Sequence, residues 1–376
     1  MGTPRTKASP MRRAFRIFVL TLFLFIGGGT IVGYQMFTYP DVATGAARGT
    51  VELSIERGAT ARLVADALAE KGLLKNPTWF RLYATQRGAA SRFKAGRYEI
   101  AAPITPRGLI DLFVKGAADP LVAVTVPEGK HMLEVVDLIA QAGIADRMAL
   151  TAKVLDAGFA RDLGLPGKSL EGYLYPDTYK FRPGTPADKV LLVLVRRHRE
   201  VFEALRAKNI EGLRDLRQRL GWGDPQIVIM ASIVEKETGR PEERPRIAQV
   251  FINRLLFPTF VPKLLQTDPT IIYGCTVGPK ILGTTSTACA QFSDRIRRIH
   301  LDDKDNPYST YAHEGLPPGP IANPGRDALE AVMKPDKTKY LYFVARNDGT
   351  HQFSATVAEH DAAVVTYQRG GKPLSK

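Results

Sequence analysis

The chain has 376 residues, enough for two or more compact units, and its 44% hydrophobic and 24% charged residues are typical of a globular protein rather than a disordered one. The formal net charge of +14 favours an anionic partner, such as nucleic acid, anionic lipid or an acidic polymer. The two cysteines and six scattered histidines form no zinc-ligand pattern, so we expect neither a metal nor another cofactor.

An apolar segment over residues 17–37 follows a basic N-terminal stretch, residues 1–16. About 20 apolar residues cross a bilayer, and basic residues keep the preceding end in the cytoplasm. We therefore predict a cytoplasmic tail over 1–16, a single transmembrane helix over 17–37 and an exported remainder.

The alternative is a cleaved signal peptide, with the small residues Gly45, Ala46 and Ala47 at the cleavage region. The apolar segment is longer than the usual signal core of about 7–15 residues, which favours a retained anchor. In both cases most of the chain is exported. Export argues against a nucleic-acid partner, as does the absence of interleaved aromatic and basic residues.

An internal repeat appears when residues 51–73 are laid over residues 122–144. Each copy alternates apolar residues as a strand does, turns at a glycine and then takes helical spacing until a second glycine. In the first copy a helix from about Pro77 to Gln86 and a short strand around Tyr98 to Ile100 follow. The first unit resembles a LysM glycan-binding module, with a plain spacer domain as the alternative. We place this module at 48–120 and the second repeat, with its linker, at 121–168.

Residues 169–181, SLEGYLYPDTYKF, form an aromatic cluster that Gly172 and Pro176 break into a loop. Aromatic faces stack on sugar rings, and Glu171 or Asp177 could bond sugar hydroxyls. The alternative is a packed loop whose tyrosines fill a core. Helical spacing resumes over about 187–208.

An apolar helix that ends on two glutamates is the strongest functional signal. In QIVIMASIVEKETGR, Asp224 is a good N-cap, Pro225 a good first helical residue, and Gly239 a stop, which predicts a helix from about Pro225 to Thr238.

The two glutamates fall on different sides of this helix. At about 100° per residue, Glu237 projects from the broad apolar face between Met230 and Ile233, whereas Glu235 falls on the narrow polar side near Ser232. A desolvated carboxyl has a raised pKa and can serve as a general acid near neutral pH, which makes Glu237 the candidate. The alternative is a structural salt bridge from Glu237 to an arginine such as Arg240 or Arg244.

Two further segments hold polar residues in irregular backbone. Residues 264–274, LLQTDPTIIYG, place Gln266, Thr267 and Asp268 at a bend before a proline. Residues 307–325 are rich in proline and glycine, which predicts a rigid loop. This loop would hold Tyr308, Tyr311 and Asn323. A helix over about 325–333 and a strand over 340–345 follow. Cys275 and Cys289 are free to pair or to remain thiols.

Five motifs occur in one order: ASIVEKET, LQTDPT with IYG, PYSTY, GLPPGPI, and YLYFVA followed by His351 and Phe353. With these motifs and one N-terminal anchor, the chain resembles the endolytic murein transglycosylases of the MltG (YceG-like) family. The resemblance covers nearly everything after the anchor and is densest from Gln226 to His360. One departure is Ser309, where the family usually has asparagine.

The resemblance implies an α+β fold: a single transmembrane helix, small LysM-like strand-helix modules, and a mixed α+β catalytic domain over 169–368. It implies cleavage of the bond between N-acetylmuramic acid and N-acetylglucosamine inside peptidoglycan strands, leaving an anhydro end. The family's catalytic glutamate corresponds to Glu237.

The resemblance also implies a place in the cell: the bacterial inner membrane, with the catalytic domain in the periplasm beside penicillin-binding synthases, where it would limit the length of nascent glycan strands. We expect six residues to bind substrate: Glu235, Gln266, Asp268, Tyr308, Tyr311 and Asn323. Two alternatives remain, a hydrolytic muramidase with Asp268 or Glu235 as base, and a non-catalytic wall-binding scaffold.

Overall fold

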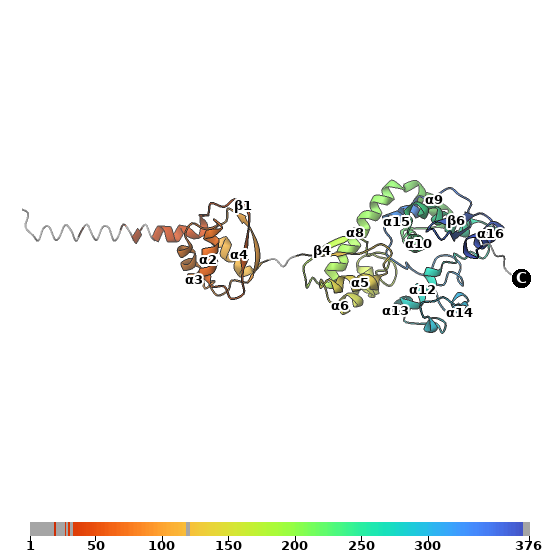
Figure 1. Ribbon diagram of the computed structural model, residues 1–376, viewed down its shortest axis with the longest axis horizontal. Coiled ribbons are helices and arrows are strands. Elements are labelled where there is room, and N and C mark those ends of the chain that lie inside the picture. Colours follow the sequence, from red (N-terminus) through yellow and green to blue (C-terminus); the bar gives the residue numbers. More distant parts are fainter. Residues whose placement is uncertain (1–18, 20–26, 28, 31–32, 118–120, 371–376) are drawn as a thin grey trace, which may run out of the picture. The chain divides into compact units, whose positions relative to one another are not determined.

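The structure is a computed structural model that describes residue 19, residue 27, residues 29–30, 33–117 and 121–370 (Figure 1). The chain divides into two compact units, Met1–Pro120 and Leu121–Lys376. The predicted membrane helix over 17–37 lies largely outside the described residues. Among those that are described, no helix has the length and apolar character needed to cross a membrane.

The first unit is built on a two-stranded antiparallel sheet, β1 (Gly49–Ile55) and β2 (Gly96–Ala102), with Leu53 opposite Tyr98. The short 3-10 helix η1 (Tyr39–Asp41) precedes the sheet, and α2 (Ala61–Glu70), α3 (Pro77–Gln86) and α4 (Pro106–Lys115) are the helices of this unit that pack with it. Side chains of Thr60, Asn76 and Thr105 cap these helices by accepting backbone N–H groups.

The core of the first unit lies where the helices meet the sheet. Leu68, Phe80 and Phe113 are fully buried there, and Tyr98 packs edge-on against Phe113. The predicted helix over 77–86 is confirmed, and the short strand around 98–100 lies within β2. The β-α-α-β order is therefore present, with α4 added after it.

In the second unit, β3 (Val122–Thr125) pairs antiparallel with β4 (Thr178–Phe181), and α5 (Met132–Gln141), α6 (Arg147–Val154) and α7 (Ala157–Asp162) lie between them in sequence. The second copy of the repeat, β3 and α5, thus has its strand partner beyond the aromatic loop. The predicted loop over 169–181 is wrong for residues 178–181, which form β4 because alternate side chains there face the core. Tyr173 and Tyr175 of the loop and Tyr179 of β4 are buried, so they fill the core.

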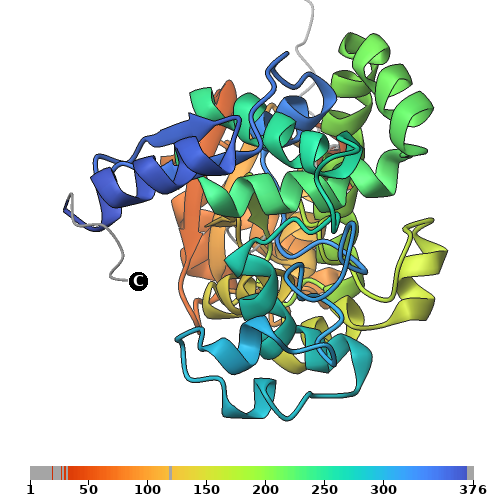
Figure 2. The same ribbon diagram turned by 90° about the vertical axis from the view of Figure 1, so that its right-hand side faces the viewer.

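Three helices form the centre of the second unit: α10 (Asp224–Glu237), α11 (Arg244–Leu256) and α15 (Arg326–Met333), which pack on one another. The helices α8 (Ala187–Lys208) and α9 (Ile210–Leu220) precede them and appear in light green at the top of this unit (Figures 1 and 2).

The start of α10 differs by one residue from the prediction, because Gly223 rather than Asp224 is the N-cap. The Gln226 side chain reaches back and accepts the Gly223 N–H at 3.0 Å, which satisfies that donor without a side chain at the cap. At the other end, Thr238 is already extended, so Glu237 is the last helical residue.

The segment after α11 forms the lower part of this unit in both views (Figures 1 and 2). It contains α12 (Asp268–Thr276), α13 (Gly278–Leu282), η3 (Cys289–Gln291) and α14 (Arg298–Leu301). The short 3-10 helix η2 (Pro241–Glu243) lies between α10 and α11. The predicted bend at Asp268 is instead the first residue of α12, because a proline at the second position suits a helix start.

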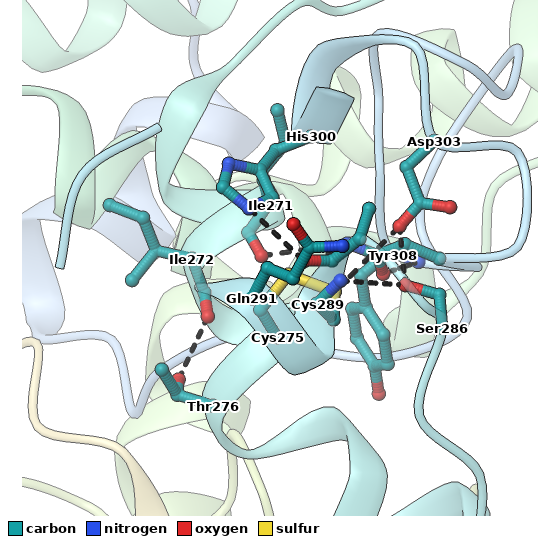
Figure 3. Close-up of a disulfide and its surroundings, with 12 residues drawn as sticks. Ile271, Ile272, Cys275, Thr276, Ser286, Cys289, Gln291, His300, Asp303 and Tyr308 are labelled. Carbon is teal, nitrogen blue, oxygen red and sulfur yellow. Dashed lines mark hydrogen bonds between the residues drawn. A yellow bond between two sulfur atoms is a disulfide. The ribbon is translucent and has the colours of Figure 1, made fainter. Parts of the chain in front are cut away.

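A disulfide joins Cys275, at the end of α12, to Cys289 (Figure 3). The loop that it closes is held further by Ser286, whose hydroxyl donates to Asp303 and accepts the Cys289 N–H at 3.0 Å. Residues 307–325 contain neither helix nor strand, as predicted. The hairpin of β5 (Tyr342–Ala345) and β6 (His351–Ser354) and the helix α16 (Val357–Gln368) complete the unit.

Candidate active site

Glu237 lies at the C-terminal end of α10 with its side chain half-buried. Its Oε1 accepts a hydrogen bond from the hydroxyl of Thr267, a buried residue immediately before α12. The backbone around Thr267 is fixed from the loop 307–325, because Gln266 N donates to Thr310 O at 3.1 Å and Thr267 N to Thr310 Oγ1 at 3.0 Å. The proline-rich loop therefore fixes the residue that contacts the glutamate.

A second carboxylate, Asp268, follows Thr267 directly and is exposed. The hydroxyl of Tyr311 donates to Asp268 Oδ1 at 2.8 Å. The negative charge of Asp268 raises the pKa of both Glu237 and Tyr311, which shows that the three groups belong to one cluster. Two predicted site residues, Asp268 and Tyr311, are thus beside Glu237.

Arg254 of α11 is the buried cation of this cluster. It donates to Leu341 O at 2.7 Å and to Leu265 O, and so ties the chain before β5 to the chain before Thr267. His351 also contributes positive charge near Glu237 and is held by Glu243, whose carboxylate lies 2.7 Å from its Nδ1.

These groups act on the Glu237 carboxyl in opposite directions. Burial is the largest effect and raises its pKa, and the charge of Asp268 adds to the rise. The hydrogen bond from Thr267 and the positive charges of Arg254 and His351 lower the pKa, but the net change is upward. Glu237 is therefore suited to hold a proton at a pH where an ordinary glutamate has lost it.

The structure contradicts the alternative interpretation, in which Glu237 forms a structural salt bridge. Within the described part of the chain Glu237 forms no ion pair. Arg240 donates to the backbone oxygens of Asp348 and Gly349, at 2.9 and 3.0 Å, and Arg244 bonds a different glutamate.

That glutamate is Glu235, and its predicted place on a polar helix face is wrong. It is buried, 2.6 Å from Arg244 Nη2, and its other oxygen accepts the Gly325 N–H at 2.9 Å. Burial raises its pKa, while Gly325 and Arg244 oppose the rise. Both α11 and α15 pack against α10, so they also cover the side of α10 that lacks large apolar residues. Glu235 therefore joins helices, and its oxygens are already occupied.

The remaining predicted binding residues fall in different places. Gln266 is exposed beside Thr267 and has a left-handed backbone, with φ of 53°. Tyr308 is buried and packs against Tyr273, with ring centroids 5.0 Å apart. Asn323 is fully buried: it donates to Lys130 O at 2.9 Å and accepts the Leu174 N–H at 2.8 Å. Only Gln266 of these three lies in the chain segment that contacts Glu237.

Glu171, which sequence reasoning placed in a sugar-binding loop, is instead a buried acid away from this cluster. It accepts the Met132 N–H at 3.0 Å, the Tyr273 hydroxyl at 2.8 Å and the Asn323 amide at 3.3 Å. Burial raises its pKa to about 8. Glu171 therefore joins the start of α5, α12 and the proline-rich loop.

The site roles of Thr267, Arg254 and the pair Glu243 and His351 were not predicted from the sequence. A usable signal exists only for Arg254, because it interrupts the apolar residues of α11 on a side that an exposed arginine would not occupy. Among the described residues, no group of three or more histidine, cysteine, aspartate and glutamate side chains could hold a metal. The cluster is suited to acid–base chemistry by side chains.

The second unit is thus a mixed α+β unit that presents a half-buried glutamic acid at the end of a central helix. The profile of the YceG-like family matches residues 53–366, most of the chain, and the chain belongs to this family.

Three relatives illustrate the similarity. The endolytic murein transglycosylase of Bacillus subtilis is 29% identical over 92% of this chain and 91% of its own length. That of Streptococcus pneumoniae serotype 2 is 26% identical over 94% of this chain, which spans 65% of the pneumococcal protein. The crystal structure of a YceG-like protein from Listeria monocytogenes matches 84% of this chain and 100% of its own, with 27% identity and a TM-score of 0.50.

Proposed function

We propose that this chain is an endolytic lytic transglycosylase that cuts the bond between N-acetylmuramic acid and N-acetylglucosamine within peptidoglycan strands, with Glu237 as the catalytic acid and then base. The observation that carries the proposal is the state of Glu237: half-buried, not ion-paired among the described residues, and with a pKa raised by burial. The curated relatives named for this activity support it.

The chemistry requires only one carboxyl. Glu237 donates its proton to the glycosidic oxygen as the bond to the anomeric carbon breaks. The resulting carboxylate then takes the proton of the muramic C6 hydroxyl as that oxygen bonds to the anomeric carbon, giving the 1,6-anhydro sugar. Ordinary glycosidases use two carboxyls because a water or a protein nucleophile must attack. An attack from within the substrate gains from proximity instead.

The neighbours of Glu237 have distinct roles in this mechanism. Thr267 orients the carboxyl through its hydroxyl. The charge of Asp268 keeps the proton on Glu237 and, on the exposed side, would stabilise positive charge that develops on the sugar ring. Tyr311 fixes Asp268, and Arg254 offsets the negative charge that appears on Glu237 once the proton has left.

The nearest rival is a hydrolytic muramidase, which the second carboxylate, Asp268, favours because it could activate a water. A wall-binding scaffold without catalysis is the other alternative. Mass spectrometry of fragments released from purified peptidoglycan separates the three. An anhydro end supports the proposal, a reducing end establishes the hydrolase, and equal release by the parent and the Glu237→Gln variant contradicts any catalytic role for this residue.

The cellular location that we propose is the one predicted from the sequence. An N-terminal helix over 17–37 anchors the chain in the inner membrane, and the catalytic unit works in the periplasm beside penicillin-binding synthases, where it limits the length of nascent strands. The first unit, with its β-α-α-β order, serves as a LysM-like module that contacts glycan. Protease accessibility of the second unit in intact spheroplasts tests this orientation, because a cytoplasmic unit would resist the protease.

A further inference from the structure

A groove of about 790 Å³ lies in the second unit, away from the residues that contact Glu237. Its walls are the junction of α8 and α9, the C-terminal part of α11, and the chain from Met333 to Lys339 that follows α15. This volume is in the range of pockets that hold small ligands or short peptides.

The rim of the groove carries positive charge that is not neutralised. Lys334, Lys337 and Lys339 line it, are exposed, and form no ion pair with any described residue. The carboxylates that also line it are already paired, because Glu211 bonds Arg214 at 2.9 Å and Asp215 bonds Arg219 at 2.9 Å. The groove therefore favours a ligand with carboxylates of its own.

The interior of the groove offers peptide-like hydrogen-bonding groups next to apolar surface. Gln249 donates to Asn253 at 2.6 Å, and no described residue donates to its own amide oxygen. The Thr338 hydroxyl has no hydrogen-bond partner in the described part of the chain, although its oxygen is buried, and rotation of the side chain would let it meet a polar group in the groove. Ile210 and Phe257 provide the apolar part of the lining.

The groove is structurally connected to the candidate active site through two consecutive residues of α11. Asn253 lines the groove and donates to Thr338 O and Tyr340 O, both at 2.9 Å, while Arg254 donates to Leu341 O and lies near Glu237. Both residues hold the same stretch of chain from different sides. The groove and the Glu237 cluster therefore share α11 as a common wall element.

We propose that this groove binds the carboxylate-bearing peptide stem of the glycan strand that is cut at Glu237. The inference rests on the proposed function and adds to it the substrate class, strands that still carry their stems. An extended stem of about five residues spans roughly 17 Å, which exceeds the ~10–12 Å diameter of a single helix such as α11. Its free carboxylates match the three lysines, and its amides match the carboxamide of Gln249 and the hydroxyl of Thr338.

The test compares two substrates with the full chain: uncrosslinked glycan strands that bear stems, and the same strands after an amidase has removed them. The triple variant K334A/K337A/K339A removes the rim charge. The triple variant K180A/K189A/K304A removes equal charge from exposed positions outside the groove and serves as the control.

We expect the parent and the control to have a higher kcat/KM on stem-bearing strands, on the order of tenfold for three partly exposed ion pairs. The groove variant should lose this preference while it keeps the parent's rate on stem-free strands. A parent without preference, or a groove variant with the parent's ratio between the two substrates, overturns the inference.

A binding measurement keeps the inference testable even if the chain proves inactive, an outcome that would reject the proposed function alone. A fluorescent stem pentapeptide is titrated against the parent and both triple variants, with anisotropy as the signal. Binding to the parent and control that weakens about tenfold in the groove variant supports the inference. No binding to the parent at about 1 mM protein, or equal binding to all three proteins, overturns it.

Discussion

Glu235 and Glu237 lie two residues apart on one helix, and we predict that the same substitution has opposite consequences at the two positions. Glu235→Gln leaves Arg244 buried with only Glu128 nearby, at 3.5 Å, because the 2.6 Å partner loses its charge. Removing one member of a buried ion pair costs about 3–5 kcal/mol of unfolding free energy. For a domain of this size that lowers Tm by roughly 10 °C or more.

Glu237→Gln should leave Tm unchanged or slightly higher, because the neutral amide avoids the cost of burying a carboxylate. It should reduce kcat by about 10²- to 10⁴-fold, the usual contribution of general acid–base catalysis. Thermal unfolding by circular dichroism and release of glycan fragments are measured on both variants, and each variant is the control for the other. A stable Glu235→Gln protein, or an unstable Glu237→Gln protein, would refute this assignment of one structural and one catalytic glutamate.

Three further perturbations follow from the contacts. Burial raises the pKa of Glu171 to about 8, so the free energy of unfolding of the parent should be highest below pH 4.5 and should fall by about 5 kcal/mol as the pH rises from there through 8. Urea unfolding at a series of pH values measures this, and Glu171→Gln should abolish the pH dependence. Thr267→Val removes a hydrogen bond that lowers the pKa of Glu237, so the alkaline limb of the pH profile of kcat/KM should move to higher pH and kcat should fall. Thr267→Ser should restore the position of the limb and kcat, whereas an unmoved limb in Thr267→Val contradicts the contact. Replacing Cys275 and Cys289 by serine opens a loop with a sequence separation of 14 and should lower the free energy of unfolding by about 3 kcal/mol. Amide hydrogen exchange in α12 should become faster, and equal exchange in the parent and the variant would argue against the disulfide.

The helix that carries the site was predictable because its signals are local. Its apolar spacing, the proline near its start and the glycine beyond its end all lie within one short stretch, so the prediction was accurate to one residue at each end. The irregular loop 307–325 was predictable for the same reason, because proline and glycine restrict the backbone wherever the chain goes.

The partners of each side chain were harder to predict because they come from distant parts of the chain. Helix geometry placed Glu235 on a polar face, but α11 and α15 cover that face and supply Arg244 and the Gly325 N–H. The partners of Asn323 were also not predictable. The sequence predicted a binding residue in a rigid loop, whereas in the structure the Asn323 side chain is buried and bonds the backbone of Lys130 and Leu174.

The amino-acid sequence by itself determined the helix that carries the site, the irregular loop 307–325, the family and Glu237 as the candidate acid, because periodicity and motif spacing are properties of neighbouring residues. Only the tertiary structure decided that Thr267, Asp268, Tyr311 and Arg254 surround this acid. The pKa of Glu237 depends on which dipoles and charges approach it through space, and those come from segments that no local pattern connects.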